Sequence, residues 1–463
     1  MEHVKEHFSV VGGGLVGSLW ALMAARRGHR VDIFERRDDP RKGRALGGRS
    51  INLALSDRGW RALEKAGMVD RVRQIAMPIQ GRLMHAVDST TTFQPYGRAD
   101  VPGVLGDGQC IYSVSRAGLN RLLVEAAEEH ADVAVHFGHK CTGLDLRRSD
   151  AVGLSFEVNG EAMEVEADRV FGTDGAFSAV RDRMMRTDRF DFEQRYLAHG
   201  YKEIEMKANP DGGFKMREDA LHIWPRGNFM LMALPNPNGT FTCTLFAPYE
   251  GHAESFENWD SDEAVKSLFE RQFPDVLPLL PNLLEDWNDH PTASLVMTRC
   301  EPWHRGERVC LMGDAAHAIV PFYGQGMNSG MEDCTVLDDL MESAPNWGTM
   351  LSEYTRLRKP DGDAILELAL RNYVEMRDLT GDPRFLLQKK IEARLQKLYP
   401  DEWLPLYSQV TFSHTRYHEA LAAGKAQDAI MEAVMDRPDI ATVWDSDEVA
   451  EAAISRLREL QHA

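Results

Sequence analysis

Short apolar runs and polar turns alternate at the start of the chain in a pattern that predicts a strand, a turn, a helix and a second strand. Phe8–Val11 is apolar, and Ser18–Arg27 carries its large apolar residues three and four positions apart, as a helix face does. Gly28 follows as a helix stop. Val31–Phe34 is apolar again and ends on Glu35. This order and length predict one unit of a parallel α/β sheet.

The turn after the first strand carries the pattern G-x-G-x-x-G. The first glycine of this pattern allows a tight turn, the second lets the backbone approach a pyrophosphate, and the third lets the helix pack closely on the strand. A carboxylate at the end of the second strand, 18 residues after the last glycine, is placed to bind ribose hydroxyls. We therefore predict a dinucleotide site at Gly12, Gly14, Val16, Gly17 and Glu35. The turn alone does not separate FAD from NAD, and an αβ turn without a ligand is the alternative.

Further along, the hydrophobic pattern predicts a mixture of strands and helices. Residues 36–50 form a polar, Gly-rich loop, and the chain is mostly helical from about residue 331. Only one strand–glycine-turn–helix unit is present, which argues against a second dinucleotide domain. Strands are predicted at Gln109–Val114, Val133–Phe137, Leu154–Val165, Arg169–Gly172 and Arg308–Met312, and helices at 57–76 and Ala117–Glu129.

Residues 190–300 change character. Ala220–Trp224, Phe229–Ala233 and Thr240–Phe246 alternate with period two, as in a half-buried antiparallel sheet. The predicted fold class is therefore α/β, with a Rossmann-like cofactor-binding domain, an inserted antiparallel-sheet substrate domain and a C-terminal helical region. We place the first domain at 1–185 and 300–345, with about 70–110 contributing to the substrate domain. The sheet domain spans 186–299 and the helical region 346–463, whose last part, 410–463, resembles two short helices.

Charge and composition narrow the class of partner. Lys plus Arg is 53 against 72 for Asp plus Glu, which gives 53 − 72 = −19 over 463 residues. This balance argues against nucleic acid or an anionic membrane as the main partner. Residues 1–7 are polar, and no apolar run approaches the roughly 18 residues that cross a bilayer. We expect a cytoplasmic protein without a signal peptide or membrane anchor.

The cysteines point to the same compartment. All six are scattered and none forms a C-x-x-C pair, which indicates reduced thiols and no metal site. The sequence leaves the oligomeric state open between monomer and dimer.

Two later motifs each follow a short apolar strand. The first runs from Gly172 to Arg181 and contains Asp174, and the second contains Asp314 and ends in the loop Gly324–Asn328. Either aspartate could also serve as a helix N-cap. The loop precedes a helix expected near Met331, so its N–H groups can stabilise an anionic ligand.

These three motifs, in this order over about 300 residues, resemble those of the aromatic-ring hydroxylase flavoproteins, the group that includes para-hydroxybenzoate hydroxylase. The resemblance implies that the dinucleotide is FAD. It implies that Asp314 binds the ribitol, that Asp174 and the backbone of Ala179 lie near the cofactor, and that reduced nicotinamide visits transiently. Met327 and Asn328 are then the candidates that face the reduced flavin.

Within that group the chain is similar, over essentially its whole length, to the kynurenine 3-monooxygenase family. The segments that carry the similarity include 48–56, 81–85, 94–97, 112–116, 222–225, 321–328, 372–376 and 407–408. The resemblance implies further FAD contacts at Arg36, Ala54, Arg116 and Cys141. It implies an aromatic substrate held by Arg82, Tyr96, Asn372 and Tyr407. Tyr323 departs from the family, where relatives often carry Phe or His.

The chemistry of these residues suits L-kynurenine, which carries a carboxylate, an ammonium group and an aniline ring. Arg82 offers a fork for the carboxylate, although a structural ion pair is the alternative for it. Asn372 and Met376 are four residues apart and share one helix face. Phe241 and Phe322 are candidates to pack on the ring, with core packing as the alternative for Phe241, and Gln325 is a candidate to orient the substrate.

The family cycle needs NADPH and O2, and it passes through a C4a-hydroperoxyflavin that hydroxylates the ring next to the amino group. It requires exclusion of water rather than a strong acid or base, so we assign no catalytic acid or base. His317 is more simply explained as a loop cap than as a base. The alternatives are a hydroxylase of another aromatic acid and a flavin-binding redox sensor or scaffold.

Overall fold

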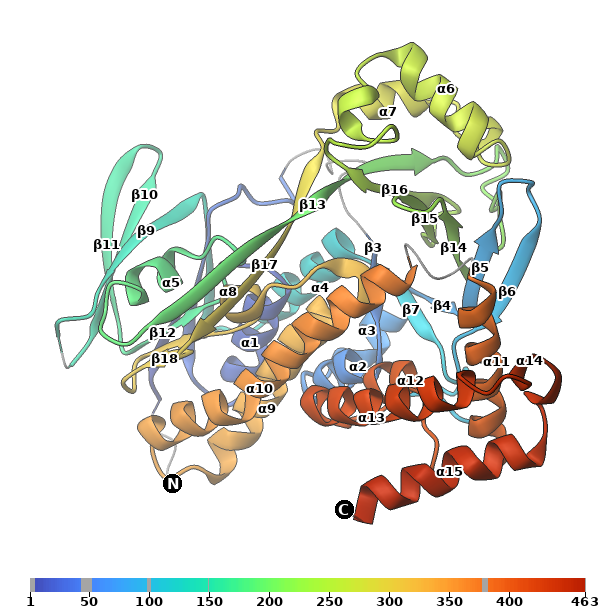
Figure 1. The fold of residues 1–463 in the computed structure, drawn as a ribbon. Helices are drawn as coiled ribbons and strands as arrows, with labels where there is room; N and C mark the ends of the chain where they lie inside the picture. Colours follow the sequence, from blue (N-terminus) through green and yellow to red (C-terminus); the bar gives the residue numbers. More distant parts are fainter. Residues whose placement is uncertain (1–4, 43–51, 98–100, 149, 377–381, 463) are drawn as a thin grey trace.

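A computed structural model describes residues 5–42, 52–97, 101–148, 150–376 and 382–462 (Figure 1). Residues 48–51 of the family segment 48–56 lie outside this part of the chain. Within the described part, no helix combines the length and the apolar character needed to span a membrane.

A six-stranded sheet forms the cofactor-binding half of the molecule. Its order is β18-β19-β12-β1-β2-β8, parallel throughout except for β18 at the edge. The strands are β18 (His304–Arg305), β19 (Val309–Leu311), β12 (Arg169–Gly172), β1 (His7–Val11), β2 (Arg30–Glu35) and β8 (Val133–Phe137). Beside it, α1 (Leu15–Arg26) packs against both α4 (Arg116–Glu128) and α9 (Gly326–Ser343). The predicted strand–turn–helix–strand unit is confirmed, with α1 starting earlier than expected because Gly14 is its N-cap residue.

A three-stranded antiparallel sheet stands beside the first sheet (Figure 1). It consists of β9 (His139–Asp145), β10 (Val152–Val158) and β11 (Glu161–Ala167). The prediction of one strand over Leu154–Val165 is therefore wrong. Asn159 and Gly160 both have positive φ, 52° and 85°, and this Asn-Gly pair reverses the chain as a hairpin turn.

A seven-stranded sheet forms the second half. Its order is β17-β13-β16-β15-β14-β5-β6. The strands are β17 (Ala293–Glu301), β13 (Asp191–Met206), β16 (Phe241–Pro248), β15 (Met230–Pro235), β14 (Ala220–Pro225), β5 (Gly81–His85) and β6 (Thr91–Pro95). The hairpin β5–β6 joins through a parallel pairing of β5 with β14, so residues from the predicted segment 70–110 do extend this sheet. The domain boundaries themselves stay a prediction.

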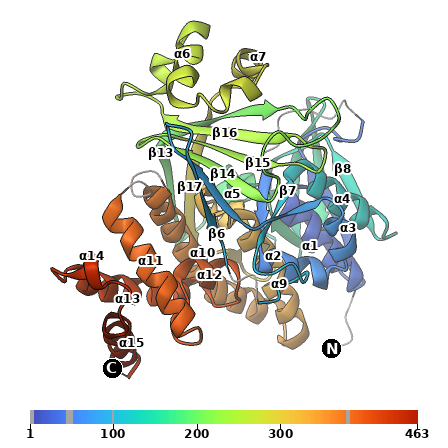
Figure 2. The same ribbon diagram turned by 90° about the vertical axis from the view of Figure 1, so that its right-hand side faces the viewer.

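The two faces of this sheet are covered differently. One face packs on α6 (Asp262–Gln272) and α7 (Leu283–Asp289), which cap it at the top of both views (Figures 1 and 2). The other face packs with residues of the C-terminal helices. The remaining short segments are η1 (Phe256–Asn258), η2 (Leu277–Leu279), η3 (Pro321–Tyr323), α5 (Ala179–Met184) and α8 (Asp314–His317).

A small sheet of β3 (Asn52–Leu55), β7 (Ile111–Ser115) and β4 (Ala76–Ile79) lies between the halves. The single helix predicted at 57–76 is instead α2 (Asp57–Lys65) and α3 (Val69–Arg73) followed by β4. Gly67, with a φ of 71°, ends the first helix, because glycine readily adopts the left-handed conformation found at helix ends.

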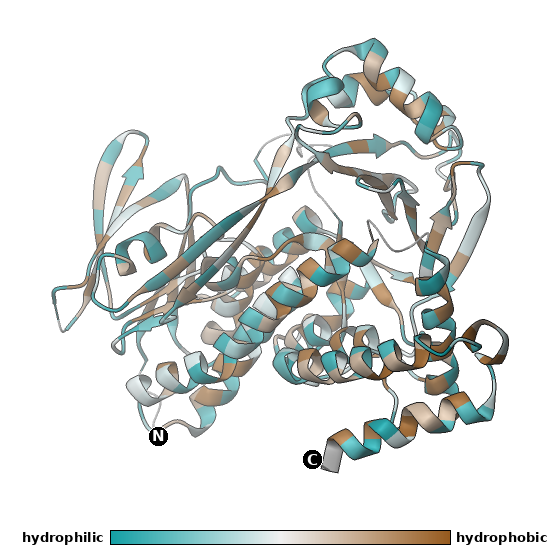
Figure 3. Cartoon of the chain, in the orientation of Figure 1, coloured by the Kyte–Doolittle hydropathy of each residue, from teal (hydrophilic) through white to brown (hydrophobic). Residues whose placement is uncertain are grey.

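The C-terminal region is helical, as predicted. It contains α10 (Trp347–Val374), α11 (Pro383–Leu398), α12 (Leu406–Thr411), α13 (Tyr417–Met435), α14 (Ile440–Val443) and α15 (Asp447–His462). The prediction of two short helices over 410–463 is wrong, because α13 and α15 are long and α14 joins them. Apolar and polar residues alternate along α15 (Figure 3), and its apolar side packs with α11 and α13.

Candidate active site

A cavity of about 490 Å³ lies between the two large sheets. Its walls carry the glycine turn at one end and Arg82, Tyr96 and Tyr407 at the other. Half of the 22 predicted site residues line it: Gly14, Val16, Ala54, Arg116, Asp314, Met327, Arg82, Tyr96, Phe322, Met376 and Tyr407. This volume is in the range of cavities that bind small organic molecules.

The three glycines of the turn lie in three different environments. Gly12 has a φ of 106°, and a Cβ there would lie 2.6 Å from the carbonyl oxygen of Thr173. A Cβ on Gly17 would lie 2.0 Å from the carbonyl oxygen of Gly12. Gly14 has no atom within 4 Å of its would-be Cβ and lines the cavity, so the backbone is bare on that side.

Glu35 braces this turn. Its buried carboxylate accepts hydrogen bonds from the backbone N–H of Gly13 at 2.9 Å and of Arg37 at 3.0 Å. Glu35, Arg36 and Cys141 do not belong to the cavity wall. Their contacts with FAD therefore stay predictions.

Asp174 lies behind the loop that lines the cavity, and its contact with FAD stays a prediction. One carboxylate oxygen accepts from the N–H groups of Ala179 at 2.7 Å and Val180 at 3.2 Å, so it caps α5, in agreement with the alternative interpretation of the motif. Burial raises the pKa of Asp174, against hydrogen bonds that lower it. The neighbouring Gly175 and Phe177 line the cavity, and the side chain of Phe177 is exposed.

The second motif brings the start of α9 to the cavity. Asp314 is exposed at the cavity wall, at the first position of α8. The helix α9 begins at Gly326, five residues before the predicted start, and Gly326 and Met327 line the cavity. Asn328 is fully buried instead, where its amide oxygen accepts from the N–H of Ser56 at 2.9 Å and its amide nitrogen donates to Ala54 at 2.8 Å.

This end of the cavity fits FAD. The open Gly14 backbone at the N-terminus of α1 suits a pyrophosphate, because free N–H groups and the helix dipole both favour an anion there. Asp314 offers an exposed acceptor for hydroxyl groups, and the N-terminus of α9 offers a second anion-stabilising end. No group of His, Cys, Asp and Glu in the described residues is arranged to hold a metal ion.

The opposite end is built around one cation. The guanidinium carbon of Arg82 lies 5.2 Å from the ring centre of Tyr96 and 4.8 Å from that of Tyr407. The described residues give Arg82 no carboxylate partner, and its Nε is buried without a hydrogen-bond acceptor. Burial opposes the charge of Arg82, but the two tyrosine hydroxyls outweigh it and raise its pKa. The guanidinium is therefore a charged donor that can bind an anionic group of a ligand.

Three tyrosine rings stack at this end. The ring centres of Tyr96 and Tyr407 lie 5.2 Å apart with planes at 11°, and those of Tyr407 and Tyr323 lie 5.6 Å apart at 14°. Burial raises the pKa values of the Tyr96 and Tyr323 hydroxyls, so both stay protonated donors at neutral pH. Tyr323, the departure from the family pattern, is thus part of the cavity wall.

The strand β16 corrects one prediction. Phe241 is buried on the far face of the seven-stranded sheet, where it packs with Phe214 and His222, and it does not reach the cavity. Because strand residues alternate between faces, Thr242, Thr244 and Phe246 line the cavity instead. Phe246 packs on Phe322 with ring centres 4.9 Å apart. Phe246 was not among the predicted site residues, although the period-two pattern predicts that it faces away from Phe241.

Two predicted substrate contacts lie just behind the wall. The amide nitrogen of Asn372 donates to the carbonyl of Phe322 at 2.6 Å and lies 3.2 Å from the sulfur of Met376. Gln325 is almost fully buried and is bonded to Tyr417 and Ser56. Neither lines the cavity, so their effect on substrate would pass through the loop that they support.

His317 is a structural residue. Its Nε2 lies 2.7 Å from Asp333, whose carboxylate also accepts from the N–H of Gly313 and from Arg358. Burial opposes ionisation of Asp333, but His317 and Arg358 outweigh it and lower its pKa. His317 thus stabilises the loop of Asp314, as expected of a loop cap, and it is not on the cavity wall.

Comparisons with known proteins agree with this geometry. The model of a family described as an FAD binding domain matches residues 7–369. Kynurenine 3-monooxygenase of Flavobacterium psychrophilum is 46% identical over 455 residues, which cover 98% of this chain and 99% of the relative. The enzyme of the same name from Myxococcus xanthus is 44% identical over 98% of this chain and 96% of its own length.

Solved structures share the fold at lower identity. The tetrameric form of 2-methyl-3-hydroxypyridine-5-carboxylic acid oxygenase is 21% identical with a TM-score of 0.65, covering 82% of this chain and 95% of its own. A single-residue variant of HpxO from Klebsiella pneumoniae, complexed with FAD, is 20% identical with a TM-score of 0.65 and covers 86% of this chain and 95% of its own.

Proposed function

Because the chain belongs to the kynurenine 3-monooxygenase family of FAD-binding aromatic hydroxylases, we propose that it hydroxylates L-kynurenine to 3-hydroxy-L-kynurenine with NADPH and O2. The observation that carries the substrate assignment is the guanidinium of Arg82, to which the described residues give no carboxylate partner and which lies between two tyrosines at the end of the cavity opposite the glycine turn. A buried cation without a carboxylate partner is costly unless a ligand supplies the anion, and the α-carboxylate of kynurenine does so.

The glycine turn, Asp314 and the start of α9 would hold FAD. Bound FAD would supply the redox chemistry between NADPH and O2. The protein's own residues bind and orient. Arg82, Tyr96 and Tyr407 fix the polar tail of the substrate, while Leu221, Phe246, Phe322 and Met376 surround its ring. Asn372 acts indirectly, because its hydrogen bond holds the carbonyl of Phe322 in place.

The apolar wall also keeps water away from the reacting ring. Phe246 and Phe322 are buried and in contact, and Met376 belongs to the same apolar cluster. Exclusion of water protects a reactive oxidant from unproductive decay. We assign no acid or base, because the aniline nitrogen of kynurenine itself activates the ring.

A hydroxylase of another aromatic acid is the second candidate, since Arg82 would also bind a benzoate-type carboxylate. Anaerobic reduction of the bound flavin by NADPH, with and without L-kynurenine, separates the two. We expect a large acceleration by L-kynurenine, and 3-hydroxykynurenine as the product in air. Equal rates with and without L-kynurenine would remove it as the substrate.

We further propose that the enzyme works in the cytoplasm. Six free cysteines, five of them buried, support a reducing compartment.

A further inference from the structure

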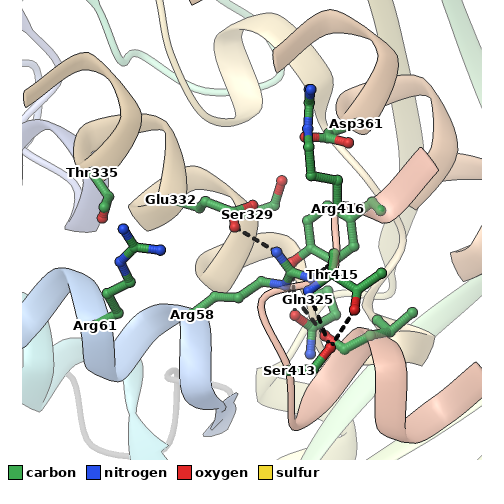
Figure 4. Close-up of polar contacts among 12 residues, drawn as sticks. Arg58, Arg61, Gln325, Ser329, Glu332, Thr335, Asp361, Ser413, Thr415 and Arg416 are labelled. Atoms are coloured by element: carbon green, nitrogen blue, oxygen red, sulfur yellow. Dashed lines mark hydrogen bonds and ion pairs between the residues drawn. The ribbon is translucent and has the colours of Figure 1, made fainter. Parts of the chain in front are cut away.

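The chain segment between α12 and α13 is fastened to the cofactor-binding half by Arg58 of α2 (Figure 4). This side chain is 1% exposed, and it donates to the carbonyl oxygens of Val410 and Thr415. It also pairs with Glu332 of α9 at 2.5 Å. Segments roughly 350 positions apart in the sequence are thus joined in the interior.

Tyr417, the first residue of α13, extends this junction toward the cofactor. The guanidinium carbon of Arg58 lies 4.0 Å from the centre of its ring. The hydroxyl of Tyr417 donates to the side-chain oxygen of Gln325 at 2.9 Å, and both side chains are buried. A C-terminal helix therefore touches the loop that leads into α9.

Gln325 occupies a special place in that loop, because it is the N-cap residue of α9. Short polar residues at this position usually direct a side-chain oxygen onto the first N–H groups of the helix, which have no acceptor within it. The side chain of Gln325 makes no such bond. Its oxygen is held by Tyr417, and its nitrogen points to Ser56 Oγ at 3.4 Å.

The uncapped helix end faces the cavity. Gly326 and Met327, the first two residues of α9, line its wall. Their N–H groups and the helix dipole favour a negative charge there, and reduced flavin is anionic. A free Gln325 oxygen would compete for these N–H groups.

We propose that Tyr417 is a positioning residue: its hydroxyl holds Gln325 away from the N-terminus of α9 and so keeps that helix end open for reduced FAD. The C-terminal helices then take part in setting the redox balance of the cofactor without touching it. The proposal rests on the FAD site and not on the identity of the aromatic substrate.

The test uses Tyr417→Phe in the full-length holoenzyme without substrate. The variant keeps the ring over Arg58 and removes only the hydroxyl, so Gln325 can turn onto the helix end. We expect reduced FAD to be bound about fivefold less tightly relative to oxidised FAD, the effect of about one hydrogen bond. A spectroelectrochemical titration reads this change as a more negative midpoint potential. An unchanged potential would overturn the proposal.

Tyr354→Phe is the matched control. Tyr354 is equally buried, on α10, and donates one hydrogen bond to the carbonyl of Leu311 at 3.3 Å, away from Gln325. We expect a similar loss of thermal stability and no change in potential. An equal shift of the potential in this control would show that any lost buried hydroxyl suffices, and the proposal would fall.

Gln325→Leu provides an independent test, because it removes the competing side chain. Its potential should stay close to that of the unmodified enzyme, and adding Tyr417→Phe should then change nothing. If the double variant shifts as far as Tyr417→Phe alone, Tyr417 does not act through Gln325.

Discussion

The two ends of the cavity are built from different parts of the polypeptide. The cofactor end is mostly backbone: a bare glycine turn and the starts of α1 and α9. The substrate end is mostly side chain: one guanidinium, three stacked tyrosine rings and an apolar wall. A site formed by the backbone loses binding when a substitution adds atoms, whereas a site formed by side chains loses binding when a substitution removes them.

The largest effect expected concerns the two faces of β16. Phe241→Ala should lower the free energy of unfolding by about 4 kcal/mol, because it leaves a hole under α6 and α7, and should leave kynurenine affinity unchanged. Phe246→Ala should weaken kynurenine binding instead, because Phe246 lines the cavity. Chemical denaturation and ligand titration measure the two quantities. Loss of affinity in a folded Phe241→Ala protein would return Phe241 to the site.

Adding one methyl group should break the cofactor end at Gly17 and not at Gly14. A Cβ on Gly17 would lie 2.0 Å from a backbone oxygen, so Gly17→Ala should cost about 3 kcal/mol of stability and abolish FAD binding. Gly14→Ala meets no protein atom and should fold normally, while its methyl group intrudes on the ligand. Thermal unfolding of the FAD-free proteins separates the two effects. Equal stability of both variants would contradict the assigned roles.

Removing a side chain should break the substrate end. Arg82→Ala should weaken L-kynurenine binding about 100-fold, since a charged hydrogen-bonded pair is lost, and should retain FAD. Arg217→Ala is the matched control, because Arg217 also stacks on a ring of the β5–β6 hairpin, Phe93 at 4.0 Å, but outside the cavity. Its affinity for kynurenine should be unchanged. Titration of flavin absorbance measures both, and unaltered binding by Arg82→Ala would remove Arg82 from the site.

The same contrast explains what the sequence could predict. The glycine turn and its flanking elements are local in sequence, so the roles of Gly12, Gly14 and Gly17 follow from spacing alone. The substrate end draws on Arg82, Tyr96 and Tyr407, which only the fold brings together, and a family resemblance was needed to connect them.

The wrong predictions also concern features that are set by the fold rather than by the local sequence. Residue type alone favours Phe241 as a site residue, although its strand face is set by register. The hairpin of β10 and β11 resembles one strand in the sequence because its apolar pattern continues through the Asn159–Gly160 turn. The first half of β13 gives only a weak apolar signal, because most of its side chains are exposed.

The smallest effect expected concerns pH and again separates the two faces of the substrate sheet. His222 lies behind the cavity, with Nδ1 2.9 Å from His85 and Nε2 2.8 Å from the carbonyl of Arg217. Burial lowers the pKa of His222 to about 4 from 6.5. Below pH 6.5 the unfolded chain takes up a proton that the folded chain refuses until about pH 4, so stability falls as pH falls through this window.

At pH 5 this difference amounts to about 2 kcal/mol, from roughly 1.5 pH units at about 1.36 kcal/mol each. His222→Gln cannot take up the proton, so its free energy of unfolding should fall by about 2 kcal/mol less between about pH 7 and pH 5 than that of the unmodified enzyme. Urea denaturation at the two pH values gives both differences. Because His222 lies on the far face, the affinity for kynurenine should not follow this change. A parallel loss of affinity would mean that the two faces of the sheet are coupled. It would contradict the assignment of packing to one face and ligand binding to the other.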